Sequence, residues 1–495
     1  MYIFSVRDDC FIGGIRGPRE TGRIFTLSRL RHSFATAQTF SAHSSGWLRT
    51  MKLGFISVLV LLLLHPGGLA YGNRATDPLI TEYGKYGTDI SVDMKVAGLS
   101  MLWSEVKYNF VYFDRVPDWD VLYLSYLPKV RKTKSILEYY RLLQEMMATL
   151  KDGHTNVRFP SKLREEEQAR PAIRTQLVEG KVIVVEVIDE KLTKEGIKVG
   201  LEVKTIDGTP VQEYAEREVK PFRGASTKQN LDVRVYSSML LTGAKDRPVK
   251  LTFADEQGST FERNLPRDEA SWSVLAAKTP SLELRMLDKN IAYLAVNNMA
   301  DDGMDDKFDS IFSTIEKADA LILDVRANDG GSDQHGAYIL SYLTDKPFEL
   351  LRSMGREYQP YERAQGGDSG WIDHGVSKGE PHGGKVFTKP VVLLMGPRTI
   401  SAAEDFCVGF DAMKRGKMIG EPTAGSTGQP LTINLPGGGI AGICTLKCTY
   451  PDGKEFVGVG VQPDVLVHPT IADIRAGRDT VLEAAMSYLN KTAIQ

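Results

Sequence analysis

The clearest hydrophobic periodicity follows Lys134 in the segment "SILEYYRLLQEMMATLKDGHT". Apolar residues recur there at helical spacing: Ile136, Tyr140, Leu143, Met147 and Leu150. Ser135 and Glu138 form a capping box at the start, and Gly153 is expected to end the helix. Residues 73–165 are therefore predicted to form a mainly helical N-terminal domain, with His154 on the loop that follows this helix.

The pattern changes over residues 170–270. The β-branched run "KVIVVEVI" at 181–188 predicts a strand, and "VKLTFADEQGSTFERNL" predicts a hairpin across Glu256-Gln257-Gly258. Turn signals at Gly200 and at Asp207-Gly208 separate further short strands. These features predict a small α+β or barrel-like module.

Residues 280–490 alternate between apolar runs and amphipathic segments. The runs "NIAYLAVNNM", "DALILDVRANDGG" and "KPVVLLMG" predict buried strands, and "GMDDKFDSIFSTIEKA" and "SAAEDFCVGFDAMKRG" predict helices. Strands that alternate with helices at this spacing are typical of an α/β fold with a largely parallel sheet.

The segment 51–72 has the form of a secretory signal peptide. A lysine precedes an apolar stretch from Leu53 to Leu64, which is too short to span a bilayer, and a Pro/Gly break follows. Because signal peptides lie at a true N-terminus, we expect translation to begin at Met51 and residues 1–50 to be a non-structural extension. An arginine-rich transit peptide and an uncleaved membrane anchor are the alternatives. Cleavage would leave a secreted or periplasmic protein without a stable membrane span.

Composition and charge give no sign of nucleic-acid binding, a disulfide scaffold or a metal site. The chain has 495 residues, 61 basic and 63 acidic side chains and a net charge of −2, so no global field favours nucleic acid. Four cysteines are too few for a disulfide scaffold, and no His/Cys cluster has zinc-ligand spacing. We therefore predict no metal and no cofactor.

The ends of two predicted parallel strands carry unusual residues, and function collects at such ends. After "LILDVRAND" come Gly330 and Gly331, whose backbone can approach a ligand closely and offer N–H groups to an oxyanion. A plain Asn-Asp-Gly-Gly turn is the alternative interpretation. After "KPVVLLMGPRTI" comes Ser401, at the start of a predicted helix.

Two interpretations of Ser401 remain open. Ser401 and Glu404 fit a capping box, which would make the serine a helix cap. A nucleophile at a helix N-terminus would instead gain from the helix dipole and from the outward amide of Ala402.

A nucleophilic serine needs a base, for which His154 is the first candidate and His335 the second. A solvated loop histidine is the alternative for His154. The pattern H-E-x-x-H does not occur, so zincins are not supported.

Four segments in order resemble the C-terminal processing, or tail-specific, serine peptidases and their tricorn-like relatives over residues 95–490. "LKDGHTNV" resembles the Asp-x-His-Thr segment of the tricorn-like branch, and "GIKVGLEVKTIDGTPV" resembles the PDZ stretch of the family. "LILDVRANDGG" resembles the segment Asp-Leu-Arg-x-Asn-x-Gly-Gly. "RTISAAEDF", followed by "GEPTAGSTGQP" and "GVGVQPDV", resembles the nucleophile region.

The resemblance implies an α/β, crotonase-like (ClpP-like) peptidase core at 280–490, with a PDZ-like module at 170–270 inserted after the helical domain. It implies Ser401 as nucleophile and His154 as base. It also implies an oxyanion hole formed by the amides of Ala402, Gly330 and Gly331.

The sequence departs from the family at the base. The segment that holds a lysine base in most C-terminal processing enzymes reads Thr423-Ala424-Gly425-Ser426, so Ser426 stands at the lysine position. Lys414 and Lys417 belong to the end of the preceding predicted helix, where we expect them to be solvated. A Ser–His pair is therefore favoured over a Ser–Lys dyad.

A second departure concerns the group that orients the histidine. Gly153 precedes His154, where the tricorn arrangement has a serine, so that relay cannot be carried over. Glu455, Glu404 and Asp152 are the candidates for the orienting carboxylate. The PDZ stretch has Gly200-Leu201-Glu202 instead of Gly-Asp, which puts peptide binding by that module in doubt.

The favoured hypothesis is a secreted or periplasmic serine endopeptidase that acts on proteins or peptides. A non-catalytic protein that binds peptides or apolar ligands on the same fold is the alternative, and an acyl-transfer enzyme is a third. A Ser401–His154 separation of roughly 3–5 Å would favour the first hypothesis. The oligomeric state, the substrate and the cleavage preference are left open.

Overall fold

A computed structural model describes residues 89–116, 118–268, 279–367 and 370–492. The predicted signal peptide and the extension before it lie outside the described residues. The described residues group into one compact unit. In the described ranges, no helix combines the length and the hydropathy that crossing a bilayer requires.

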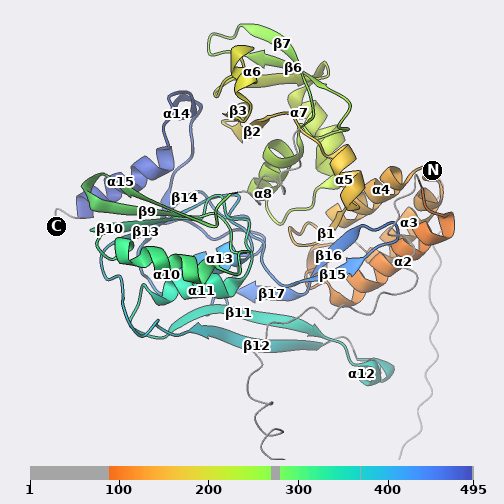
Figure 1. Cartoon of the computed structure of the whole chain (residues 1–495). Coiled ribbons are helices and arrows are strands. Elements are labelled where there is room, and N and C mark those ends of the chain that lie inside the picture. The colour runs from red at the N-terminus through yellow and green to blue at the C-terminus, as the bar shows by residue number, and fades with distance from the viewer. Residues whose placement is uncertain (1–88, 117, 269–278, 368–369, 493–495) are drawn as a thin grey trace, which may run out of the picture. The chain divides into compact units, whose positions relative to one another are not determined.

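A six-stranded sheet lies at the centre of the C-terminal half (Figure 1). Its strand order is β18 (Val465–Leu466), β14 (Lys417–Gly420), β13 (Val391–Met395), β10 (Ala320–Asp324), β9 (Ile291–Val296) and β8 (Leu282–Leu287). All neighbours pair in parallel except β8, which is antiparallel to β9. The predicted largely parallel sheet is therefore confirmed.

Helices cover both faces of this sheet, which explains why its central strands are continuous apolar runs. One face packs against α10 (Met304–Ile315), α11 (Asp333–Ser341) and α13 (Ala402–Ala412) through residues such as Leu323, Phe308 and Phe406. The other face packs against α15 (Thr480–Thr492) through residues such as Ile322 and Leu394. The short helix α14 (Ile471–Arg475) precedes α15.

The N-terminal helices share a hydrophobic core with this α/β layer. They are α2 (Val92–Asn109), α3 (Trp119–Arg131) and α4 (Ile136–Ala148), with a 3₁₀ turn at Phe113–Arg115 and a short α5 (Ser161–Glu167). Ser135 caps α4 by accepting from Glu138 N–H, as predicted. The prediction that Gly153 ends this helix is wrong: α4 ends at Ala148, and the left-handed residue that follows it is Lys151, with φ of 50°.

Two small antiparallel sheets connect distant parts of the chain. In one, β1 (Asn156–Arg158) pairs with β16 (Ile440–Cys444), which pairs with β15 (Pro430–Asn434). In the other, β11 (Phe348–Glu357) lies between β12 (Gly370–Gly379) and β17 (Leu446–Thr449). The short helix α12 (Pro360–Ala364) joins β11 to β12. Because β1 begins two residues after His154, its pairing with β16 holds the histidine loop against the C-terminal half.

Residues 172–265 build a separate hydrophobic core around an antiparallel sheet. Its strands are β2 (Ile173–Val178), β3 (Lys181–Val187), β4 (Glu202–Ile206), β5 (Thr209–Pro210), β6 (Val249–Ala254) and β7 (Thr260–Leu265). Its helical segments are α6 (Glu190–Lys194), α7 (Val211–Tyr214), α8 (Lys228–Asp232), a 3₁₀ turn at Lys220–Phe222 and π-helical segments at Ala215–Val219 and Val233–Met239. The predicted hairpin across Glu256-Gln257-Gly258 is confirmed as β6–β7.

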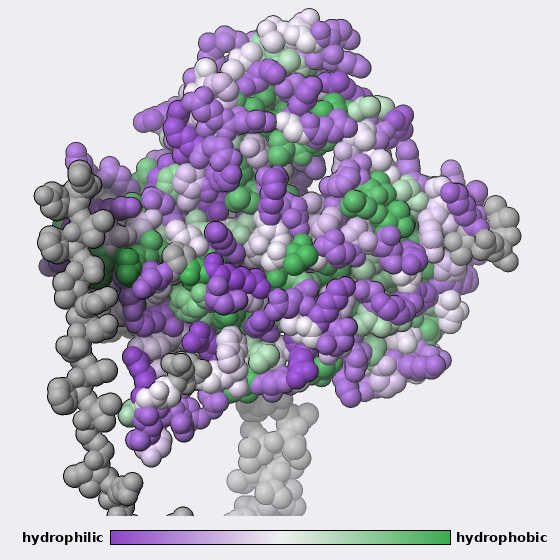
Figure 2. Space-filling model, turned by 180° about the vertical axis from the view of Figure 1, so that it is seen from behind, coloured by the Kyte–Doolittle hydropathy of each residue, from purple (hydrophilic) through white to green (hydrophobic). Residues whose placement is uncertain are grey.

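The face shown in Figure 2 is mainly hydrophilic, and apolar residues occur on it in separate patches. Scattered apolar residues are normal at a protein surface. Three cysteines of the described chain, Cys407, Cys444 and Cys448, are buried free thiols.

Candidate active site

Ser401 lies between the end of β13 and the start of α13 in a strained backbone conformation. Its φ is 63° and its ψ is −133°, a combination that L-residues rarely adopt. Its side chain makes no capping hydrogen bond to the helix. Strain of this kind persists only where the surrounding structure imposes it, and the hydroxyl is left available for chemistry.

Glu404 does not complete the capping box because other donors bind its carboxylate. The side chain is fully buried and accepts from Thr423 Oγ1, from Gly425 N–H at 2.7 Å and from Ser426 N–H at 2.8 Å. Burial raises the pKa of Glu404 to about 8, and these hydrogen bonds oppose the rise. Glu404 thus fixes the loop 423–426 beneath the start of α13.

His154 lies between two serine hydroxyls. Its Nε2 is 2.9 Å from Ser401 Oγ, and its Nδ1 is 2.8 Å from Ser426 Oγ. In the tautomer that accepts a proton at Nε2, Nδ1–H donates to Ser426 Oγ. Burial lowers the pKa of His154, and the negative charge of Asp152 opposes that shift. The imidazole is therefore neutral near pH 7 and able to accept a proton.

Ser426 is the residue of this site whose contact the sequence did not predict. Besides its hydroxyl on His154, its carbonyl oxygen accepts from Ser401 N–H at 3.0 Å, and its own N–H donates to Glu404. The sequence held one signal: by the family resemblance, Ser426 stands at the position of a lysine base, and Gly153 precedes the histidine.

Gly153 leaves the space that the Ser426 side chain occupies beside His154. A Cβ at residue 153 would lie 2.6 Å from Ser426 Oγ. Any side chain at residue 153 would therefore clash with the Ser426 hydroxyl that contacts His154 Nδ1.

Within the described chain, none of the three candidate carboxylates hydrogen-bonds to the imidazole ring of His154. Glu455 is half-exposed and pairs with Lys447 at 2.9 Å. Asp152 is buried, and it accepts from the backbone N–H of His154 at 3.1 Å and from Ser226 Oγ at 3.2 Å. Asp152 thus holds the loop and acts on the ring only through its charge, whereas Ser426 makes the direct contact.

The glycine loop after β10 meets the nucleophile loop at short range. Ile400 N–H donates to Asn328 O at 3.2 Å, and a Cβ at Gly330 would lie 2.6 Å from Ser401 Cβ. The N–H of Gly330 already donates to Asn328 Oδ1 at 2.8 Å. Gly331 and Ala402, in contrast, line the cavity next to Ser401.

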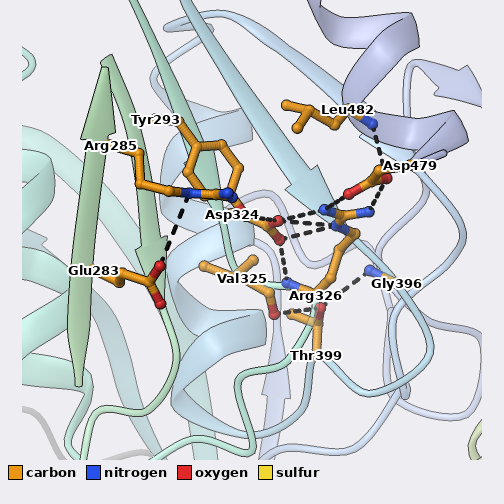
Figure 3. Close-up of polar contacts among 10 residues, drawn as sticks. All are labelled: Glu283, Arg285, Tyr293, Asp324, Val325, Arg326, Gly396, Thr399, Asp479 and Leu482. Atoms are coloured by element: carbon orange, nitrogen blue, oxygen red, sulfur yellow. Dashed lines mark hydrogen bonds and ion pairs between the residues drawn. The ribbon is translucent and has the colours of Figure 1, made fainter. Parts of the chain in front are cut away.

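Ionic contacts and a hydrogen bond hold these two loops in place (Figure 3). The Arg326 guanidinium bridges Asp324, at the end of β10, and Asp479, just before α15, with bonds to Asp479 of 2.7 Å. Thr399 Oγ1 donates to Val325 O at 2.9 Å, which ties the loop before Ser401 to the loop after β10. Because these contacts fix two strand ends, the backbone donors near Ser401 are held in place.

The other sequence candidates lie outside this arrangement. His335 Nδ1 contacts Asp305 at 2.7 Å, on the helices α11 and α10. Lys414 and Lys417 pair with Asp411 and Asp464, each at 2.8 Å. Among the residues that the structure describes, no group of three or more His, Cys, Asp or Glu side chains is placed to hold a metal ion.

Replacing Gly153 with alanine is expected to lower the reaction rate of Ser401 by about 10- to 100-fold, because the new methyl displaces the Ser426 hydroxyl from His154. The rate of covalent labelling by a serine-reactive probe measures this. Gly384→Ala is the matched control, since the nearest atom to a Cβ there is His382 Cδ2 at 3.7 Å. Equal labelling rates in both variants would contradict the role of Gly153.

Parts of the chain match known protein families. Residues 290–467 match the model of peptidase family S41, and residues 99–148 match that of the tricorn protease C1 domain. The chain is 26% identical over 151 residues to a chloroplastic C-terminal processing peptidase of Tetradesmus obliquus, covering 30% of this chain and 29% of the relative. It is 24% identical over 268 residues to the carboxy-terminal processing protease CtpA of Bacillus subtilis, covering 53% and 52%.

The matches therefore span between 29% and 52% of the length of these two curated relatives. Among solved structures, mature CPAF is similar with a TM-score of 0.62 at 18% identity, covering 81% of this chain and 96% of that chain. This likeness concerns the fold. The predicted resemblance to the C-terminal processing peptidases is confirmed by the family matches and by the names of these relatives.

Proposed function

We propose that this chain, whose residues 290–467 match the model of peptidase family S41, is a serine endopeptidase that cleaves peptide bonds through an acyl-enzyme at Ser401. The observation that carries the proposal is the contact of 2.9 Å between Ser401 Oγ and His154 Nε2. This distance is within the hydrogen-bond reach that a nucleophile and its base require.

In the proposed reaction, Ser401 Oγ attacks the peptide carbonyl carbon while His154 Nε2 takes the hydroxyl proton. The negative charge that develops on the carbonyl oxygen is stabilised by the N–H groups of Gly331 and Ala402. His154 then gives its proton to the leaving amine, and a water molecule hydrolyses the acyl-enzyme by the same route.

Ser426 and Asp152 divide a task that one carboxylate performs in other serine peptidases. Ser426 Oγ accepts from Nδ1–H and so fixes the tautomer and the orientation of the ring. Asp152 supplies the negative charge that favours the imidazolium formed during the reaction. The hydrogen bond to the neutral Ser426 hydroxyl therefore holds the His154 ring in place. The charge of Asp152 stabilises the protonated ring without direct contact.

The proposal extends to the peptidase core and to the antiparallel module before it. The core at 280–490 is proposed to be crotonase-like, and the antiparallel module at 170–270 to be PDZ-like and to bind peptide at the edge of its sheet. This module contacts the site directly: Arg234 donates to Gly153 O at 2.9 Å, and Gln229 donates to Thr423 O at 3.0 Å. The signal-peptide pattern at 51–72 supports a secreted or periplasmic location.

Labelling with a fluorophosphonate probe tests the proposal. The protein beginning at Asn73 should form a stable adduct, and mass spectrometry of the digested protein should place it on Ser401. Heat-denatured protein is the control, because labelling that survives denaturation does not depend on the site. An unlabelled native protein would overturn the proposal and favour the non-catalytic alternative.

A further inference from the structure

A cavity of about 140 Å³ lies beside Ser401, and Gly331 and Ala402 are among the residues that line it. If the proposed function holds, the carbonyl of the scissile bond lies between Ser401 and these two amides. The side chain of the residue that supplies this carbonyl, the P1 residue, then points into this cavity. The cavity therefore decides which residues the enzyme cleaves after.

Polar and apolar side chains both line the cavity. The apolar part comes from α11, α13, β11 and β17 through Ala337, Leu350, Leu351, Phe406, Leu446 and Cys448. A dry cavity of about 150 Å³ binds a benzene-sized group, so this cavity has room for a long side chain. The apolar walls suit the carbon stem of such a side chain.

Two carboxylates also line the cavity. Asp405 follows Ser401 by one helical turn on α13, and Asp333 is the first residue of α11. Asp405 accepts one hydrogen bond, from Thr427 Oγ1 at 2.7 Å. No lysine or arginine of the described chain lines the cavity. The two carboxylates therefore have no cationic side chain beside them in the cavity lining.

The energetic consequence depends on the charge of the P1 side chain. Burial and the charge of Asp333 raise the pKa of Asp405 to about 7, so ionisation of the empty site is costly. An apolar P1 side chain would bury these carboxylates further, and an acidic one would be repelled. A cation would compensate them while its carbon stem covers the apolar wall.

We infer that the enzyme cleaves after lysine and arginine, with the aliphatic stem of the P1 residue against Leu350 and Leu351 and its charge on Asp405. Asp405 is thus proposed as the residue that determines P1 specificity. This inference rests on the proposed function, because it assigns the substrate class of the same site.

The test compares peptides that differ only at P1, taken from cleavage sites that mass spectrometry identifies in a peptide library. For the protein beginning at Asn73, kcat/KM for P1 lysine is expected to exceed that for P1 leucine by at least about tenfold. In Asp405→Asn, kcat/KM for lysine should fall by about 10- to 100-fold, whereas that for leucine should change by less than about threefold. Asp405→Leu should reverse the preference.

Asp411→Asn is the matched control, because it removes a negative charge from the same helix outside the cavity lining. It should leave the lysine-to-leucine ratio unchanged. Labelling of Ser401 by the fluorophosphonate probe is measured in every variant. Labelled proteins that cleave without a preference for basic residues, or a ratio unaffected by Asp405→Asn, would overturn this inference alone. Absent labelling in the unaltered protein would overturn the proposed function, and this inference with it.

Discussion

Replacing Ser401 with alanine is expected to lower peptide cleavage by about 10⁵-fold while the unfolding free energy changes by less than about 0.5 kcal/mol. The loss is large because the nucleophile itself is removed. The stability effect is small because the Ser401 side chain caps nothing. Single-turnover cleavage assays and thermal unfolding of the same preparation measure both quantities.

The stability measurement separates the two sequence interpretations of Ser401. If the hydroxyl were a helix cap, its loss would cost about 1 kcal/mol. Ser401→Gly provides a further check, because glycine adopts the φ of 63° with little strain. That variant should be inactive yet more stable than the alanine variant by about 1 kcal/mol. Cleavage above about 1% of the original rate in Ser401→Ala would contradict its role as nucleophile.

Replacing His154 with glutamine is expected to lower cleavage and probe labelling by about 10⁴-fold, because Ser401 then loses the group that removes its proton. Glutamine keeps a hydrogen-bonding side chain between the two serines but cannot act as a base near pH 7. His335→Gln is the control, since the His335 ring contacts Asp305 instead. If the His154→Gln protein were labelled at the original rate, a group other than His154 would be the base.

The pH dependence follows from the sign of the shift at His154. Burial lowers the pKa of His154 below its ordinary value of 6.5, and only the neutral ring accepts a proton. The labelling rate should therefore rise with increasing pH through a midpoint below 6.5. A midpoint above 7 would show that the imidazole is not the base, or that Asp152 outweighs burial.

The sequence by itself predicted the central strands and several helices, and it offered Ser401 and His154 as candidates for the site. Continuous β-branched runs predicted β9, β10 and β13, and helical spacing with a serine cap predicted α4, because these signals are local. Ser401 and His154 were recognised from short segments next to such elements. The predicted end of α4 at Gly153 was wrong. The helix ends at Ala148, and Lys151 rather than the glycine adopts the left-handed conformation after it.

Only the tertiary structure decided how the site is assembled. Ser426 contacts His154 across 272 positions of the chain, a pairing that no local pattern encodes. Glu404, predicted to cap a helix or to orient the histidine, binds the loop of Ser426 because three donors converge on its buried carboxylate. Local sequence patterns determine which residues are presented at strand ends, whereas the packing of distant strand ends determines which of them meet.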